Sequence, residues 1–466
     1  MATVRTSIHG YWSSRFVFVL AAAGSAVGLG NIWKFPYIAG ENGGGAFVLL
    51  YLLCIALFGI PVMMSEVLLG RRGRRSPVNT MTTLAAEEKR SRVWRLLGIM
   101  GVLAGFLILS YYSVIAGWAL AYIVETATGT FSGVTGERAG EVFTNLISNP
   151  QRLLFWHTLF IVLTMLVVVR GVTNGLEKAV RILMPALFVL IIIMIGYAML
   201  NGDFIEGLKF LFTPDFSKLS PEVVLKAMGQ AFFSLSLGMG AIMMYGSYLP
   251  DDASIATTSF QVALADTLVA ILAGLAIFPI VFANGLEASQ GPGLIFNTLP
   301  LAFGQMSGGL IFGTLFFILL VFAAWTSAIS LIEPAVAWLI ERFSISRFIS
   351  SMVCGLVVWA IGLGTVYSFN SWKKIEVFNG TFLEDKSFFD LLDYLTSNIM
   401  LPLGGLLICV FAAWSMTEKS RREELKIKHE GAYKIWRFLA RYITPIGVTL
   451  IFLHVLGVLE KLNLVT

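Results

Sequence analysis

Eleven long apolar segments dominate the sequence and restrict what the chain can become. Most of them reach about 20 residues, the length that a helix needs to cross the hydrocarbon core of a bilayer. Only 13% of the residues are charged, about half the share in a soluble domain. A soluble enzyme, a nucleic-acid-binding protein and a secreted disulfide scaffold are therefore excluded. We predict an all-α polytopic membrane protein with eleven transmembrane helices, near residues 13–38, 43–70, 96–125, 153–169, 180–200, 222–249, 258–284, 309–340, 348–367, 388–415 and 438–459.

Basic residues set the orientation of these helices, because cytoplasmic loops are enriched in Lys and Arg. With a cytoplasmic N-terminus, the inner loops hold most of the 33 basic residues. We therefore predict a multi-pass protein of the plasma (inner) membrane, with its C-terminus on the outside. Lipid headgroups account for the basic clusters, so no nucleic acid partner is expected. No feature of the sequence indicates an oligomeric state.

Two features lie between the predicted helices. Residues 286–303 are apolar, but the segment is short and contains Pro292 and Pro300, so we interpret it as an external hairpin or a re-entrant loop. Asn379-Gly380-Thr381 has the form of a glycosylation site, which we interpret as a chance match.

Glycine is concentrated in the first and sixth apolar segments. The first contains AAAGSAVGLGN (21–31) and the sixth contains GQAFFSLSLGMG (229–240). Close helix packing explains such glycines in a single helix, but here they recur at matching places in two consecutive five-helix halves. Interrupted helices at equivalent positions of two inverted repeats indicate a transporter site. We predict repeats at 1–200 and 222–416, broken helices 1 and 6, and an additional helix 11 at 435–460.

The same segments resemble the neurotransmitter:sodium symporters. The resemblance rests on GSAVGLGNIWKFPYIAGENGGGAF (24–47), GIPVMMSEVLLGR (59–71), SYY (110–112), GQAFFSLSLGMGAIMMYGSY (229–248) and TSAISLIEP (326–334). It implies secondary active import of a small amino acid or amine, driven by two sodium ions. Amine-transporting relatives have an aspartate where this chain has Gly28, so a substrate with its own carboxylate is indicated.

The resemblance also assigns two sodium sites. Carbonyl, hydroxyl and amide oxygens replace the hydration shell of sodium without burying full charges. For Thr326 and Ser327, hydrogen bonding within their own helix is the alternative role. Site 1 is assigned to Ala26, Asn31, Ser234 and Asp266, and site 2 to Gly24, Val27, Ala323, Thr326 and Ser327.

The implied substrate site surrounds the two broken helices. Amides near Leu29 and Gly30 and the Tyr112 hydroxyl are expected to meet the substrate carboxylate, because a helix N-terminus favours negative charge. The lining is mostly apolar, which indicates a neutral, hydrophobic amino acid. The predicted set is Ser25, Ala26, Gly28, Leu29, Gly30, Ile108, Tyr112, Phe233, Ser234, Ser236, Met239, Ala328 and Leu331.

The family pattern further implies gates on both sides of the site. Lys34 and Asp393 match the outer pair, with Phe233 as a lid. Lysine lacks the bidentate fork of the usual arginine, which predicts a weak or water-mediated outer contact.

Trp12 and Glu341 match the inner gate, where His9 stands in place of an arginine. Either Arg5 or Arg15 substitutes for that arginine, or the histidine adds sensitivity to pH.

Asp266 is the main departure from chloride-dependent relatives, which have asparagine there and serine one turn later. Here the later residue is Ala270. A fixed carboxylate can offset the positive charge of two sodium ions, so we predict transport without a chloride requirement. Rival interpretations are an ion channel and a sodium-dependent sensor that binds without transporting. No enzymatic residue set is present, so we do not expect an enzyme.

Overall fold

The computed structural model describes residues 5–288, 293–372 and 386–455, and within these ranges the chain is helical, without β-strands. Nine helices of the described residues are long and apolar enough to cross a membrane. A tenth span is the bent pair Arg15–Ala26 and Gly30–Glu41. The predicted sixth span corresponds to two shorter helices, Pro221–Ser234 and Ala241–Ser247. The predicted all-α fold is confirmed, and the structure agrees with eleven spans.

The helices follow in chain order, and several spans contain more than one of them. Their bounds are α1 Arg15–Ala26, α2 Phe35–Glu41, α3 Gly45–Cys54, α4 Ile60–Gly73, α5 Pro77–Glu87, α6 Arg95–Ala127, α7 Gly136–Ile147, α8 Pro150–Val168, α9 Glu177–Asn201, α10 Phe204–Phe212, α11 Pro221–Ser234, α12 Ala241–Ser247, α13 Ile255–Ala283, α14 Leu299–Gln305, α15 Gly309–Phe343, α16 Arg347–Ser368, α17 Phe388–Asp393, α18 Leu401–Val410, α19 Glu418–Leu425, α20 Glu430–Phe438 and α21 Thr444–Val455.

Three segments with sequence predictions fall partly or wholly outside this description. Asn379 lies outside the described residues, as does the end of the predicted helix 11 beyond Val455. The described part of the 286–303 segment is helical from Leu294 to Gln305. The division into repeats at 1–200 and 222–416 stays a prediction.

Both predicted breaks are present. In the first span, α1 ends at Ala26 and Val27 has an extended backbone, with the span bent by 50°. In the sixth, the backbone leaves the helix after Ser234, and Gly238 and Gly240 have φ values of +80° and +76°. Glycine adopts positive φ without steric penalty, so the glycines permit the unwinding of the sixth span.

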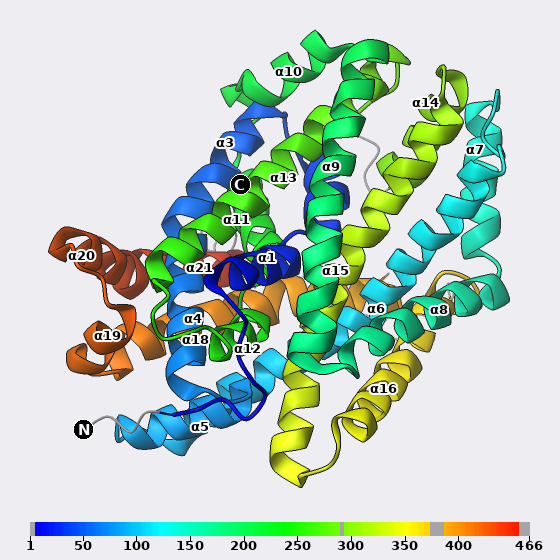
Figure 1. Cartoon of the computed structure of the whole chain (residues 1–466). Helices are drawn as coiled ribbons and strands as arrows, with labels where there is room; N and C mark the ends of the chain where they lie inside the picture. The colour runs from blue at the N-terminus through cyan, green and yellow to red at the C-terminus, as the bar shows by residue number, and fades with distance from the viewer. Residues whose placement is uncertain (1–4, 289–292, 373–385, 456–466) are drawn as a thin grey trace.

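The breaks lie among the central helices of the bundle (Figure 1). The longest helices, α6 and α15, pack along each other, and α1 packs against α9, α13 and α15. Close approach of α6 to α15 depends on Gly105, where a Cβ would lie 2.9 Å from the Leu331 carbonyl oxygen. The central helices therefore enclose the unwound backbone, the condition under which it persists at membrane depth.

Candidate functional site

The two breaks are joined by a direct hydrogen bond. The Ser236 hydroxyl donates to the Ser25 carbonyl at 2.9 Å. Ser236 has a φ of +54°, a conformation that disfavours an L-residue by roughly 1–2 kcal/mol. The unwound part of the sixth span therefore holds Ser236 in a strained conformation at the point where the two interrupted helices meet.

Glu66 on α4 supports the break in the sixth span. Its fully buried carboxylate accepts hydrogen bonds from the backbone N–H groups of Gly238 at 3.1 Å and Met243 at 3.3 Å. These amides lack the partners that a continuous helix would supply. Glu66 is not among the residues predicted from the sequence, although a carboxylate inside an apolar segment is the same signal that identifies Asp266.

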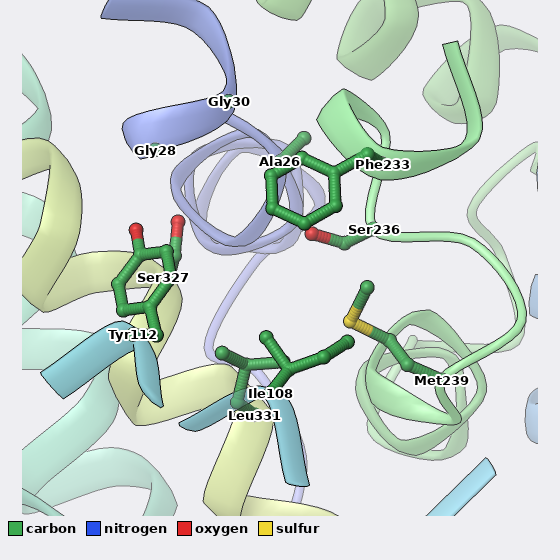
Figure 2. Close-up of a pocket in the computed structure, with 10 residues that line it drawn as sticks. All are labelled: Ala26, Gly28, Gly30, Ile108, Tyr112, Phe233, Ser236, Met239, Ser327 and Leu331. Atoms are coloured by element: carbon green, nitrogen blue, oxygen red, sulfur yellow. The ribbon is translucent and has the colours of Figure 1, made fainter. Parts of the chain in front are cut away.

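A small cavity lies between the breaks. Tyr112 and Ser327 border it on one side and Phe233 and Ser236 on another (Figure 2). Its volume is about 20 Å³, little more than one water molecule requires, so the surrounding side chains must separate to admit an amino acid. The lining residues are Ala26, Gly28, Gly30, Ile108, Tyr112, Phe233, Ser236, Met239, Ser327 and Leu331.

One end of the cavity carries polar groups of the first break. The Leu29 N–H donates to the Tyr112 hydroxyl at 3.1 Å. Gly28 is packed so tightly that a Cβ there would lie 2.4 Å from the Ser327 hydroxyl and 2.8 Å from the Tyr112 hydroxyl. The helix that resumes at Gly30 begins here, and such a helix end favours a negative charge. This end of the cavity therefore suits a carboxylate.

The rest of the cavity is apolar. Ile108, Met239 and Leu331 are almost completely buried and line it together with Phe233. No acidic side chain lines the cavity among the described residues. An unpaired carboxylate or ammonium on a ligand side chain would be poorly solvated here, so the surroundings favour an apolar side chain.

Five predicted residues form what we call the neutral oxygen cluster: Gly24, Val27, Ala323, Thr326 and Ser327. The Ser327 hydroxyl lies 3.4 Å from the Gly24 carbonyl oxygen and 3.2 Å from that of Val27. The Thr326 hydroxyl donates within its own helix, to the Ala323 carbonyl at 3.0 Å and the Phe322 carbonyl at 3.2 Å, which is the alternative role expected for it from the sequence. Because hard oxygen donors without a full charge suit a monovalent cation, this cluster fits sodium in its chemistry.

A second group, which we call the carboxylate cluster, comprises Asn31, Tyr51, Ser234 and Asp266. The Asn31 amide nitrogen donates to an Asp266 carboxylate oxygen at 2.7 Å. The Tyr51 hydroxyl donates to the other carboxylate oxygen at 3.2 Å and lies 2.9 Å from the Ser234 hydroxyl. Gln230 joins this region by donating to the Gly30 carbonyl at 2.7 Å. The cluster is linked to the cavity, because the Asn31 amide oxygen accepts from the Gly28 N–H at 3.2 Å.

The predicted outer gate residues Lys34, Asp393 and Phe233 lie close together. Lys34 Nζ is 3.7 Å from an Asp393 carboxylate oxygen and 4.4 Å from the centre of the Phe233 ring. The separation exceeds that of a direct hydrogen bond. Asp393 also accepts a hydrogen bond from the Ser397 hydroxyl at 2.8 Å. The three predicted residues therefore meet, but their charged groups are held loosely.

The predicted inner gate residues are buried. His9 Nε2 lies 2.9 Å from a Glu341 carboxylate oxygen, and these side chains are only 4% and 3% exposed. Glu341 also accepts from Ser76 and Asn79. Trp12 packs edge-on against Tyr245 and Tyr248.

His9 itself occupies the place of the missing arginine, and neither Arg5 nor Arg15 replaces it. Arg5 pairs with Glu87 at 2.9 Å, and Arg15 donates to Gln261 at 3.1 Å. Burial raises the pKa of Glu87, but hydrogen bonds and charges from Arg72 and Arg5 outweigh it and leave the pKa below its ordinary value.

The structure thus gathers most of the predicted substrate set around one cavity, while four of its residues do not line it. Leu29 approaches through its amide, and Ser234 belongs to the carboxylate cluster. Ser25 donates its hydroxyl to Ser330 at 2.7 Å, and Ala328 is fully buried but is not among the lining residues. Ser327, predicted only as an ion ligand, also lines the cavity.

Two broken helices that enclose a small central cavity are typical of a membrane transporter of the broken-helix type. Comparison with known proteins agrees. The sequence model of the Sodium:neurotransmitter symporter family matches residues 9–138 and 143–464. The chain belongs to this family, as its sequence motifs indicate.

Individual relatives cover nearly the whole chain. A Bacillus subtilis protein, YhdH, described as an uncharacterised sodium-dependent transporter, is 40% identical over 452 residues, which cover 96% of this chain and 98% of that protein. The crystal structure of MhsT in complex with L-phenylalanine is similar, with a TM-score of 0.87, 43% identity, and coverage of 95% and 99% of the two chains. The bovine sodium-dependent neutral amino acid transporter B(0)AT2 is 29% identical, covering 58% of this chain and 40% of that protein.

Proposed function

We propose that this protein is a sodium-coupled symporter that imports a neutral, hydrophobic amino acid by alternating access. The observation that carries the proposal is the divided character of the central cavity. Its polar end offers amides, the Tyr112 hydroxyl and a helix start, whereas its other side is apolar. An amino acid has the same division. A similar structure, MhsT, was solved with L-phenylalanine.

Gly28 decides between an amino acid and an amine. Its backbone lies so close to Ser327 and Tyr112 that no side chain fits without movement. Among the described residues, no Asp or Glu side chain lines the cavity. The substrate carboxylate takes the place beside Gly28, and the Leu29 and Gly30 amides and the Tyr112 hydroxyl bind it.

The two oxygen clusters hold two sodium ions in this proposal. The neutral oxygen cluster supplies three carbonyls and the hydroxyls of Thr326 and Ser327 to one ion. The other ion binds Asn31, Ser234, Asp266 and the Ala26 carbonyl, and the substrate carboxylate completes its shell. A ligand shared by ion and substrate makes the binding of each favour the binding of the other.

Transport proceeds without chloride because Asp266 supplies the compensating charge. Two sodium ions and a zwitterion place net positive charge in a region of low dielectric, where uncompensated charge is costly. The fully buried Asp266 carboxylate offsets part of it. The protein functions in the plasma membrane with its N-terminus in the cytoplasm, so the buried His9–Glu341 gate faces inward.

Uptake into sealed proteoliposomes tests the function. We expect labelled hydrophobic amino acids to accumulate above their external concentration under an inward sodium gradient, and not under a potassium gradient. An ion channel would pass sodium without concentrating solute. A sensor would bind the amino acid with sodium but leave the lumen empty. Either result would refute symport.

A further inference from the structure

An apolar groove runs between α8 and α16 on the surface of the helix bundle, away from the central cavity. The two helices pack side by side (Figure 1), and the groove has a volume of about 470 Å³. Its floor is narrow because Gly355 approaches α8 closely: a Cβ there would lie 2.9 Å from Met165 Cγ. The walls are exposed apolar side chains, Val162 and Leu166 on α8 and Met352 and Leu356 on α16.

The length of the groove matches one leaflet of a bilayer. Thr158 and Trp359 close one end, with Trp359 Nε1 donating to the Thr158 hydroxyl at 2.9 Å. Arg170 and Phe348 lie at the other end. Helical rise over the segment from Thr158 to Arg170 is about 18 Å, close to half of a hydrocarbon core of about 30 Å. The groove therefore fits one acyl chain that starts at the Arg170 end and stops near the membrane centre.

Arg170 provides a charge at the end of the groove where a lipid headgroup would lie. It is exposed, and its side chain forms no ion pair within the described ranges. The neighbouring Arg347, by contrast, is committed to the buried Glu333 carboxylate and to the Val168 carbonyl at 2.7 Å. Arg170 is thus free to bind a phosphate with charge-assisted hydrogen bonds.

We propose that this groove binds an anionic phospholipid of the cytoplasmic leaflet, with an acyl chain between α8 and α16 and the phosphate against Arg170. A symmetric second copy of the chain is a less suitable occupant. Two-fold symmetry about the membrane normal would set the two Arg170 residues at the same depth, and no acidic residue lines the groove in the described part of the chain to pair with them.

Native mass spectrometry of the full-length protein tests this with phosphatidylglycerol and phosphatidylcholine of identical acyl chains. The native protein should retain phosphatidylglycerol in preference. Arg170→Gln should weaken retention of phosphatidylglycerol about fivefold, from the loss of about 1 kcal/mol of headgroup attraction, and leave phosphatidylcholine unchanged. Leu166→Trp, which fills the groove, should reduce retention of both lipids.

Two control variants keep the test specific. Arg92→Gln removes an exposed arginine outside the groove, and Ile192→Trp enlarges an exposed side chain on α9; both should retain lipid like the native protein. Equal retention of the two lipids by the native protein, or an unchanged preference in Arg170→Gln, would overturn the proposal. So would a dimer in size-exclusion chromatography that Leu166→Trp converts to a monomer, because the occupant would then be a second copy.

Discussion

The neutral oxygen cluster and the carboxylate cluster both contact the first break, but they differ in charge. The neutral cluster joins the end of α1 to α15 through carbonyls and hydroxyls, with Ser327 bridging to Gly24 and Val27. The carboxylate cluster joins the resumed helix to α13 through Asn31 and the fully buried Asp266. One offers only dipoles to an ion, whereas the other offers a carboxylate.

In the proposed function, this difference lets two cations bind beside one carboxylate, that of the fully buried Asp266. A dipole cluster binds sodium by replacing water and leaves the charge of the ion in place. A carboxylate neutralises a charge as well as ligating it. Gly28 lies between the clusters, since its N–H donates to Asn31 and its Cα faces Ser327. Substitutions in the two clusters and at the positions around them test this difference.

The largest effect is expected at Gly28. Gly28→Asp should abolish amino acid binding, because a protein carboxylate would oppose that of the substrate. A Cβ at this position also crowds Ser327 and Tyr112, so Gly28→Ala is needed to measure the steric part. Competition against a labelled amino acid measures the loss for both variants.

The decarboxylated amine of the same substrate separates charge from size. It should compete better in Gly28→Asp than in Gly28→Ala. Equal affinities of the two variants for the amine would leave only the steric effect and refute the role of charge at this position.

Removal of an ion ligand should have the next largest effect. Asn31→Ala and Thr326→Ala should each raise the sodium concentration for half-maximal uptake by about fivefold to a hundredfold, since a lost polar ligand in a desolvated site weakens binding by about 1–3 kcal/mol. Asn31→Ala should have the larger effect, because it also deprives Asp266 of a hydrogen bond at 2.7 Å.

Matched controls for these variants are Thr314→Ala, whose hydroxyl bonds within α15, and Asn201→Ala at the exposed end of α9. Both should keep the native sodium dependence in uptake measurements. Normal sodium dependence in Asn31→Ala and Thr326→Ala together would remove the assignment of both clusters.

Removing the negative charge of the carboxylate cluster should have a smaller effect, which depends on whether chloride is present. The native protein should transport equally when gluconate replaces chloride. Asp266→Asn combined with Ala270→Ser should transport several-fold faster with chloride than without it, because the region near Tyr51, Gln230 and Ser234 loses its negative charge and can then hold an anion. Strong chloride dependence of the native protein would leave Asp266 as a sodium ligand only.

The smallest effect is expected at the outer gate. Lys34→Gln should change the amino acid affinity less than about fivefold, because partly exposed ion pairs contribute about 0–1 kcal/mol, and this pair is separated by 3.7 Å. The sodium requirement should stay native, since neither cluster includes Lys34. A tenfold change in the sodium requirement of Lys34→Gln would show that the outer gate and the two oxygen clusters are coupled.

Much of the fold was predictable from residue types alone. Apolar segments of membrane-spanning length gave the helices, and glycine-rich stretches marked both breaks, because backbone conformation at Gly238 and Gly240 is a local property. Contacts between distant residues were harder to predict. Glu66 accepts a hydrogen bond from Gly238, which is 172 positions away in the sequence. No local sequence pattern predicts such a distant partner.

The inner gate shows the same limit. The family pattern placed Trp12 and Glu341 together but left open whether Arg5 or Arg15 substitutes for the missing arginine or whether His9 adds sensitivity to pH. Only the packed structure distinguishes them, because Arg5 and Arg15 have partners of their own and His9 reaches Glu341. Which side chain pairs with Glu341 depends on contacts that several helices make at once. No single segment of the sequence contains all of these contacts.

The ratio of sodium to amino acid taken up in a single proteoliposome experiment tests most directly whether both clusters carry ions. Radioactive sodium and a labelled hydrophobic amino acid are measured together, at saturating sodium, in the native protein. Two ions, one from each cluster, should enter with each amino acid. A ratio of one would mean that one cluster is structural, and amino acid uptake without any sodium uptake would contradict sodium coupling altogether.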